Sequence, residues 1–389
     1  MTKSGVQPDA YTCNTLIHGL CTTGQVGRAL QLKNNMLKWN CRPDVVSCNV
    51  IIDTLCKGGL LDEALVLFSE MLHDFNVVSD VFAYNTLING FGNSGRLKEA
   101  KRLFDEMVSR GISANVTTYT SLIHCHCLHG QQKEARRYFD EMMDRRISPD
   151  VVTFGVLIDS HCKDGMTEDA WGLFKLMDEI NIQPNQITYN SMMDGLCLVG
   201  RLQDAVKLFD SMVDRGLKPT ESNYSVLING YCKKRKVDEA MRLFKKMGQN
   251  GLKPTTVSYS IVLAGLYRDG RVGTARNLFN EMLSFGLSPS IITYGIVLDG
   301  YCKNGKLEEA IELFESMEGT AGISANEYMY AIIIHALFRA GKLEDARKLF
   351  NEIPSKGVVP DVVTYSTMIN GVLVYQMLEH MIFSFRDFL

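Results

Sequence analysis

Residues 81–115 read VFAYNTLINGFGNSGRLKEAKRLFDEMVSRGISAN, and this stretch contains the pattern that decides the fold. In its first half, Tyr84, Leu87 and Ile88 follow the i, i+3, i+4 spacing that places apolar side chains on one face of an α-helix. The second half repeats this spacing, and a glycine follows each apolar stripe as a helix-ending residue. The segment therefore predicts two amphipathic helices joined by a short turn.

The same pattern fills almost the whole chain of 389 residues. The twentieth place of each repeat holds alanine, which allows two helix backbones to approach closely. Most repeats have 35 residues, and two carry one extra residue near their end. The ten repeats are residues 10–44, 45–80, 81–115, 116–150, 151–185, 186–220, 221–255, 256–290, 291–326 and 327–361.

These helix pairs predict an all-α fold. One pair cannot bury both of its apolar stripes, whereas stacked pairs can, so we expect one continuous α-solenoid instead of several globular domains. Residues 1–9 fit the end of a truncated preceding repeat, and residues 362–389 form a partial, divergent one. We expect a mostly monomeric chain whose incompletely covered ends favour self-association.

Composition excludes several classes of function. Lysine plus arginine total 41 and aspartate plus glutamate total 44, a net charge of −3, so the chain is not uniformly basic. No stretch approaches the ~20 apolar residues of a membrane span. No secretory signal opens the sequence, and its eleven cysteines are expected to be reduced thiols. Binding of nucleic acid would therefore have to use one local surface.

The first helix of each repeat carries a polar stripe. Because a helix advances about 100° per residue, the second, fifth, ninth and thirteenth places share one side, opposite the apolar face. In residues 81–115 these places hold Phe82, Asn85, Asn89 and Asn93. Stacking of the first helices is expected to line a groove with this stripe, once per repeat.

The chemistry of the stripe suits a single-stranded nucleic acid. Most second-place residues offer a flat or apolar surface for a base: Tyr11, Val46, Phe82, Thr117, Val152, Ile187, Val257, Ile292 and Tyr328. Fifth-place amides and hydroxyls can bond a Watson–Crick edge. The thirteenth place supplies candidate phosphate-binding cations: Lys57, Lys163, Lys233, Arg268, Lys303 and Arg339.

The period and two runs, TYNSMMDGLC at 188–197 and LEEAIELFESM at 307–317, resemble the pentatricopeptide repeat family. The uniform repeat length resembles its pure-repeat P class, and YCKNGKLEEA at 301–310 is similar to restorer-of-fertility-like members. The resemblance implies a right-handed superhelix that binds single-stranded RNA, one nucleotide per repeat. It implies a non-enzymatic role, without cofactor, in stabilising, processing or translating organellar transcripts.

The resemblance also implies a cellular setting. The expected location is the mitochondrion, or alternatively the chloroplast, although the chain contains no transit peptide. Expected partners besides RNA are auxiliary nucleases or ribosome-associated proteins, with no membrane.

Family resemblance further implies that the fifth and last residues of a repeat read one base together. Carried over, the pairs imply the site U-U-Y-G-A-Y-R-R-A-N, and Ala331 with Asp361 matches no readable pair. The reading pairs are Asn14/Asp44, Asn49/Asp80, Asn85/Asn115, Thr120/Asp150, Gly155/Asn185, Asn190/Thr220, Ser225/Thr255, Ser260/Ser290 and Gly295/Asn326.

Three alternatives stay open. All last residues are Asp, Asn, Ser or Thr, the favoured N-cap residues, so capping alone would explain that row, and the cations would then be a solvated face. A protein-binding scaffold of the tetratricopeptide type is a second alternative, although Trp39 and Trp171 do not recur as that repeat requires. A truncated, non-functional copy of a larger RNA-binding protein is the third.

One run, His124-Cys125-His126-Cys127-Leu128-His129, looks like a metal site. However, Cys127 occupies the twelfth place, which holds cysteine in several other repeats. We therefore expect structural thiols and no metal. The paired acids of the second helices are expected to form a solvated outer face, so that acids outside balance bases inside.

Overall fold

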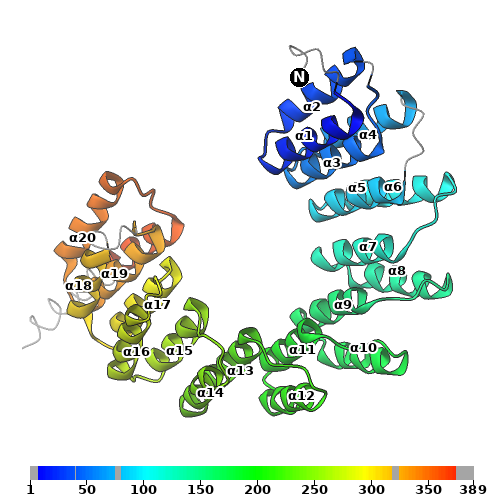
Figure 1. The fold of residues 1–389 in the computed structure, drawn as a ribbon. Helices are drawn as coiled ribbons and strands as arrows, with labels where there is room; N and C mark the ends of the chain where they lie inside the picture. The colour runs from blue at the N-terminus through cyan, green and yellow to red at the C-terminus, as the bar shows by residue number, and fades with distance from the viewer. Residues whose placement is uncertain (1–7, 40, 75–79, 318–323, 374–389) are drawn as a thin grey trace, which may run out of the picture. The chain divides into compact units, whose positions relative to one another are not determined.

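The computed structural model describes residues 8–39, 41–74, 80–317 and 324–373 (Figure 1). Within these ranges the chain forms α-helices, two short 3-10 helices and no β-strand. The chain divides into two compact units, residues 1–195 and 196–389, and each is described by itself. Each unit is an α-solenoid of helix-turn-helix repeats, so the predicted all-α fold class is confirmed.

The N-terminal unit alternates first and second helices. Its first helices are α1 (Ala10–Thr22), α3 (Val45–Lys57), α5 (Val81–Asn93), α7 (Val116–Leu128) and α9 (Val151–Lys163). Its second helices are α2 (Val26–Met36), α4 (Leu61–Asp74), α6 (Leu97–Ser109), α8 (Gln132–Asp144) and α10 (Thr167–Glu179), and the 3-10 helix η2 (Leu37–Trp39) follows α2. Helix α11 (Gln186–Leu198) contains the boundary between the units.

The C-terminal unit continues the alternation. Its first helices are α13 (Glu221–Lys233), α15 (Thr256–Arg268), α17 (Ile291–Lys303) and α19 (Glu327–Arg339). Its second helices are α12 (Leu202–Asp214), α14 (Val237–Gln249), α16 (Val272–Ser284), α18 (Leu307–Ser316) and α20 (Leu343–Glu352), and the 3-10 helix η4 (Ile353–Lys356) follows α20. A further helix covers 362–373.

Each first helix begins at the first residue of a 35- or 36-residue repeat. Parts of the expected division fall on 1–7, 75–79, 318–323 and 374–389, which lie outside the described residues. No helix among the described residues is long and apolar enough to cross a membrane.

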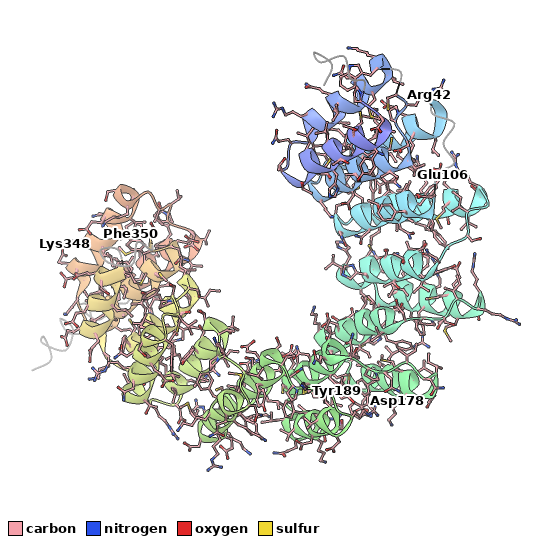
Figure 2. All side chains as sticks on the ribbon, viewed as in Figure 1. Arg42, Glu106, Asp178, Tyr189, Lys348 and Phe350 are labelled. Carbon is pink, nitrogen blue, oxygen red and sulfur yellow. The ribbon has the colours of Figure 1, made fainter. Side chains whose placement is uncertain are left out.

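An aromatic ladder joins neighbouring repeats. Phe104 of α6 meets Tyr119 of α7 edge-on, with ring centroids 5.7 Å apart. Such pairs add about 0.5–1.5 kcal/mol beyond the area that they bury. Tyr189 and Phe350, labelled in Figure 2, belong to the ladder. The other pairs are Phe68–Tyr84, Phe139–Phe154, Phe174–Tyr189, Phe209–Tyr224, Phe244–Tyr259, Phe279–Tyr294, Phe314–Tyr330 and Phe350–Tyr365.

The seam between the first two repeats lacks this aromatic contact. Lys33 stands in the place of the phenylalanine and Cys48 in the place of the tyrosine. Lys33 is 4% exposed, and its Nζ lies 2.8 Å from Oε2 of Glu70. An ion pair therefore replaces an aromatic pair at this seam.

Close contact between first helices explains the twelfth-place cysteines. The tenth-place glycine of one repeat packs on the twelfth-place residue of the repeat before it. A Cβ added to Gly195 would lie 2.5 Å from Sγ of Cys162, closer than real contacts allow. The same arrangement joins Gly230 to Cys197 and Gly265 to Cys232. The twentieth-place alanines are also buried, as their role in close packing predicts.

Candidate nucleic-acid interface

The second-place residues lie on the surface of both units, as the helical geometry predicts. Phe82 is 55% exposed and Tyr11 is 81% exposed. Large apolar side chains at these levels of exposure leave their faces open to a planar ligand. The other exposed residues of the row are Val46, Thr117, Val152, Ile187, Ser222, Val257, Ile292 and Tyr328.

The fifth-place residues are not exposed, which corrects the expected stripe. Asn49 and Asn85 are only 7% and 8% exposed. Successive first helices, such as α5 and α7, pack side by side and cover the flank that carries this place. Ser225, Ser260, Gly295 and Ala331 are also buried, while Asn14, Thr120, Gly155 and Asn190 are half-buried.

The last residues of the repeats cap the following first helices, as their residue types predict. Oδ1 of Asp80 accepts the backbone N–H of Ala83 at 3.1 Å, and Oδ1 of Asn115 accepts that of Thr118 at 3.0 Å. Each cap satisfies a backbone donor at the start of a helix. The same bond is made by Asp44, Asp150, Asn185, Thr220, Thr255, Ser290, Asn326 and Asp361.

Capping leaves Asp and Asn with different spare groups. In Asp80 and Asp150 the second carboxylate oxygen, Oδ2, makes no hydrogen bond among the described residues, and it can only accept. In Asn115, Asn185 and Asn326 the spare group is Nδ2, which can only donate. The last residue therefore presents an acceptor or a donor while it caps a helix.

Three fifth-place asparagines contact these capping residues. Nδ2 of Asn14 donates to Oδ2 of Asp44 at 3.0 Å, and Nδ2 of Asn49 donates to Oδ1 of Asp80 at 3.3 Å. Because a carboxylate accepts only, it fixes which end of the amide faces it. Oδ1 of each asparagine is buried without a partner among the described residues.

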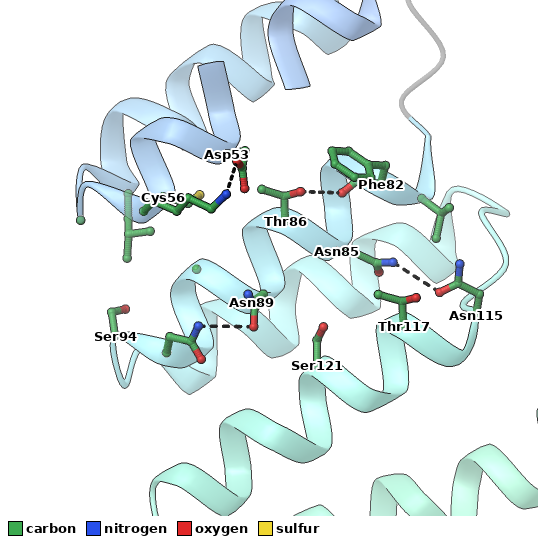
Figure 3. A pocket seen from close by; sticks show the side chains of 16 residues that line it. Asp53, Cys56, Phe82, Asn85, Thr86, Asn89, Ser94, Asn115, Thr117 and Ser121 are labelled. Atoms are coloured by element: carbon green, nitrogen blue, oxygen red, sulfur yellow. Dashed lines mark hydrogen bonds and ion pairs between the residues drawn. The ribbon is translucent and has the colours of Figure 1, made fainter. Parts of the chain in front are cut away.

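The pocket in repeat 81–115 collects these places (Figure 3). Nδ2 of Asn85 donates to Oδ1 of Asn115 at 3.3 Å, and Phe82 and Thr117, the second-place residues of consecutive repeats, line the same pocket. Asn89 and Asn93 also line it. The buried fifth residue and the exposed last residue thus both line a cavity and do not lie inside the helical core.

The same construction recurs in both units. A pocket of the N-terminal unit is lined by Val152, Gly155, Asn185 and Ile187. In the C-terminal unit the corresponding residues are Ile292, Gly295, Asn326 and Tyr328. In the part of the chain that the structure describes, the second, fifth and last places therefore meet in more than one repeat.

Three last residues of the C-terminal unit carry a single polar group, a hydroxyl, and each hydroxyl is already bonded to another side chain. Thr220 Oγ1 donates to Oδ1 of Asn223 at 2.8 Å. Thr255 Oγ1 donates to Oε1 of Glu221 at 3.0 Å. Ser290 Oγ shares a 3.0 Å hydrogen bond with Oγ1 of Thr293.

The thirteenth-place cations fall into two groups. The ammonium of Lys57 lies 2.7 Å from Oδ2 of Asp53, and Lys163 and Lys303 pair in the same way with ninth-place aspartates, Asp159 and Asp299, at 2.6 and 2.7 Å. The paired acids of the second helices are largely exposed, as expected, but these ninth-place aspartates line the pockets, so acids are not confined to the outer face. The i, i+4 spacing in the sequence was the missed signal. Lys233, Arg268 and Arg339 make no ion pair among the described residues.

The His124–His129 run serves the packing. Among the described residues, no three His, Cys, Asp or Glu side chains lie close enough to hold a metal ion. Nε2 of His129 lies 2.9 Å from the carbonyl oxygen of Gly92 in the preceding repeat. Burial raises the pKa of the Cys125 thiol to about 12 and lowers the pKa of His126. A thiol with so high a pKa stays protonated and unreactive at neutral pH.

Comparison with known proteins agrees with this architecture. The sequence profile of the PPR repeat family matches residues 8–57, 79–128, 114–163, 149–198, 186–233, 219–268, 254–303, 289–337 and 325–373. A single PPR repeat profile matches residues 46–74. No curated protein sequence matches the chain.

Among solved structures, the pentatricopeptide repeat protein PPR10 from maize is similar, with 22% sequence identity and a TM-score of 0.58. The alignment covers 97% of this chain and 63% of the maize chain, so the chain spans less than two thirds of that protein. Yeast Rmd9p, solved with a 16-nt target RNA, matches with 12% identity, covering 91% of this chain and 89% of its own, at a TM-score of 0.43.

Proposed function

The chain belongs to the pentatricopeptide repeat family, and from this premise we propose that it binds single-stranded RNA selectively, one nucleotide per repeat. The observation that carries the proposal is the recurrent pocket. In repeat 81–115, Phe82 and Thr117 flank the cavity, and the Asn85–Asn115 hydrogen bond lies between them (Figure 3). A base seated there would rest against the second-place side chains while its edge meets the polar pair.

The capping geometry supports a rule for the last residue. A capping Asp keeps a spare acceptor, which suits the N3–H of uracil or the N1–H of guanine. A capping Asn keeps a spare donor, which suits N3 of cytosine or N1 of adenine. This division agrees with the readings carried over from the family, in which Asp44, Asp80 and Asp150 imply U, U and G.

The fifth residue would then select between purine and pyrimidine bases, because its size sets the space that remains for the base. Around Gly155 an added Cβ would meet nothing within 4 Å, so that pocket has room for the larger ring of adenine. Asn49 and Asn85 fill the equivalent space with an amide and favour pyrimidines. The proposed site is U-U-Y-G-A-Y-R-R-A-N along the chain, and its first four positions carry most of the information.

We place this binding on organellar transcripts, and we assign the chain to the P class and to the restorer-of-fertility-like group. Uniform 35-residue spacing supports the class, and the 301–310 run supports the group. The bound protein would exclude nucleases or keep a hairpin open, with auxiliary nucleases or ribosomes acting on the exposed RNA. Sequencing of RNA crosslinked to the protein in isolated mitochondria and chloroplasts tests this role, and crosslinks confined to cytosolic messages would contradict it.

Replacement of two fifth-place asparagines tests base reading. Asn14→Ala with Asn49→Ala should weaken binding of a UUCG-containing RNA and leave binding of a CCCG-containing RNA less affected, because the amides that hold Asp44 and Asp80 are lost. Fluorescence anisotropy measures both affinities. Ser225→Ala with Ser260→Ala is the matched control, and equal losses in the two double variants would contradict the proposal.

A further inference from the structure

We propose that the basic turn Lys233-Lys234-Arg235-Lys236 is the main phosphate-binding anchor of the chain, and this inference rests on the proposed RNA binding. These residues occupy the thirteenth to sixteenth places of repeat 221–255, at the end of α13 and in the turn before α14. In that repeat the run places four cations in sequence, whereas the turns of the other repeats carry at most two.

The place of this turn within its repeat puts it beside the groove. In three other repeats the thirteenth and fourteenth places line the pocket that contains the fifth place. Lys303 and Asn304 line the pocket that contains Gly295, and Lys163 and Asp164 line the pocket that contains Gly155. The same places hold Lys233 and Lys234 in repeat 221–255. A phosphate next to a base in the groove would therefore meet these cations.

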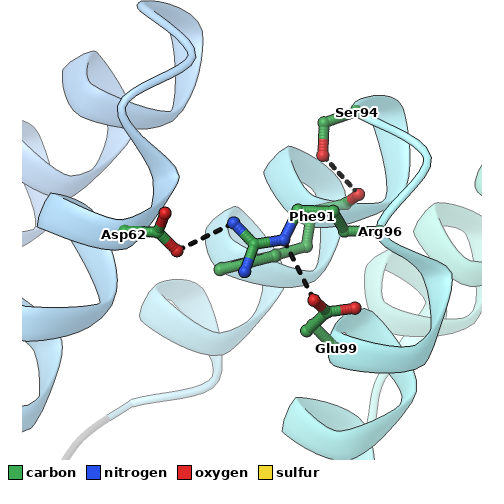
Figure 4. Close-up of polar contacts among 5 residues, drawn as sticks. All are labelled: Asp62, Phe91, Ser94, Arg96 and Glu99. Carbon is green, nitrogen blue, oxygen red and sulfur yellow. Dashed lines mark hydrogen bonds and ion pairs between the residues drawn. The ribbon is translucent and has the colours of Figure 1, made fainter.

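Several turn cations elsewhere have carboxylate partners, although Arg268 and Arg339 make no ion pair among the described residues. Nη1 of Arg96 lies 2.8 Å from Oδ1 of Asp62 in the preceding repeat, and its Nε lies 3.0 Å from Oε1 of Glu99 (Figure 4). Arg271 likewise pairs with Asp238 and Asp269. An arginine held by two carboxylates must break those contacts before it neutralises a phosphate.

The four cations of the basic turn are exposed and make no ion pair among the described residues. The ammonium of Lys234 extends toward the turn of the preceding repeat, because a Cβ added to Gly200 would lie 2.9 Å from its Nζ. Each unpaired cation that neutralises a phosphate releases counterions from the RNA and so adds to its affinity, without first breaking an ion pair within the protein. The basic turn therefore has more charge available to phosphate than any other turn described.

Arg235 occupies a backbone conformation that favours glycine. Its φ is 57°, and the equivalent place in other repeats holds glycine, as in Gly200 and Gly270, with φ of 83° and 76°. A non-glycine residue in this region strains the backbone. Replacing Arg235 by glycine thus removes one charge without a folding penalty, which separates a binding role from a structural one.

The bases next to this anchor are read weakly. Thr220, Thr255 and Ser290 end three consecutive repeats with an engaged hydroxyl. The region around the basic turn would therefore hold the RNA backbone, while repeats 10–150 discriminate bases.

The test compares two triple variants of the full chain by fluorescence anisotropy across a salt series. The RNAs are UUCGACAGAU and a second oligonucleotide with its first four bases changed. Lys233→Ala with Lys234→Ala and Arg235→Gly should lower the slope of log K against log salt by about 2, since each lost phosphate contact in single strands removes ~0.7. Affinity for both RNAs should fall by the same factor.

Lys57→Ala with Lys163→Ala and Lys303→Ala removes equal charge from ion-paired lysines, and it should change the slope less than half as much. Arg235→Gly alone should weaken RNA binding while the melting temperature stays equal or rises. Equal slope changes in the two triple variants, or unchanged binding by Arg235→Gly, would overturn the anchor alone. A wild-type chain that binds neither RNA would overturn the proposed function as well.

Discussion

The repeats of residues 10–150 and the repeats of residues 221–290 fold alike, but they differ in the side chain of their last residue. In the first region Asp80 and Asp150 cap the next helix with one carboxylate oxygen and keep the other unbonded among the described residues, while the second oxygen of Asp44 accepts from Asn14. In the second, Thr255 and Ser290 cap with a hydroxyl that is also bonded to a neighbouring side chain. Because Asp, Asn, Ser and Thr all cap a helix well, the fold leaves the choice among them open. That freedom allows one scaffold to hold both base-selective and base-tolerant repeats.

Removing caps from both regions is the strongest way to break this comparison. Asp44→Ala with Asp80→Ala, and separately Thr255→Ala with Ser290→Ala, should each lower the free energy of unfolding by about 1 kcal/mol per cap. Only the aspartate variant should lose the preference for U over C at the first two bases. That preference is worth about 3 kcal/mol in total, at the lower end for hydrogen bonds to a charged group. Urea unfolding and anisotropy measure the two effects, and equal loss of preference in both variants would contradict the comparison.

A single substitution at the last residue of one repeat tests the comparison between the two regions more sharply. Asp80→Asn keeps the cap but replaces the spare acceptor by a donor, so the second base should change from U to C by about 1.5 kcal/mol, with stability nearly unchanged. The reciprocal change, Asn115→Asp, should shift the third base from C toward U. Competition binding with four oligonucleotides measures both shifts. A variant that still prefers the original base would show that the last residue does not read the base.

Introducing a spare group into the tolerant region should have a smaller effect. Thr255→Asn would cap the same helix and add a free amide beside Glu221, whose carboxylate accepts a hydrogen bond. We expect a new preference of about 1 kcal/mol for A over G at the base of repeat 221–255. Thr255→Ser is the control, because it keeps a hydroxyl. Binding that stays indifferent to this base in the asparagine variant would count against the rule.

The smallest expected effect concerns two ion-paired lysines of the N-terminal unit. Asp53→Asn with Asp159→Asn should release Lys57 and Lys163 and raise RNA affinity by about 0.5 kcal/mol per lysine, the usual size of an exposed ion pair. Asp194→Asn removes one charge, against two in the double variant, from the ninth place of a repeat that has Leu198 at the thirteenth. It breaks no i, i+4 lysine pair and only weakens the field of Asp194 on Lys163, so the gains are compared per removed charge. A larger gain in that control than in the double variant would contradict the proposed pairing.

Sequence periodicity predicted the helices and the exposed second place because both depend on a single helix. The burial of Asn49 and Asn85 depends on the next first helix, so one helical wheel could not show it. The pairing of Lys57 with Asp53 was readable from its i, i+4 spacing but was overlooked. The engaged hydroxyl of Thr255 required coordinates, since Glu221 lies 34 residues earlier in the chain.

Selection of bound sequences from randomised RNA by the purified chain tests the central claim most directly. The account predicts strong enrichment of U-U-Y-G at the positions of repeats 10–150 and only a weak preference for purines at the positions of repeats 221–290. Selected RNAs that show no base preference at the first four positions would contradict the account. Selected RNAs whose strongest base preference lies at the repeats that end in Thr255 and Ser290 would contradict it as well.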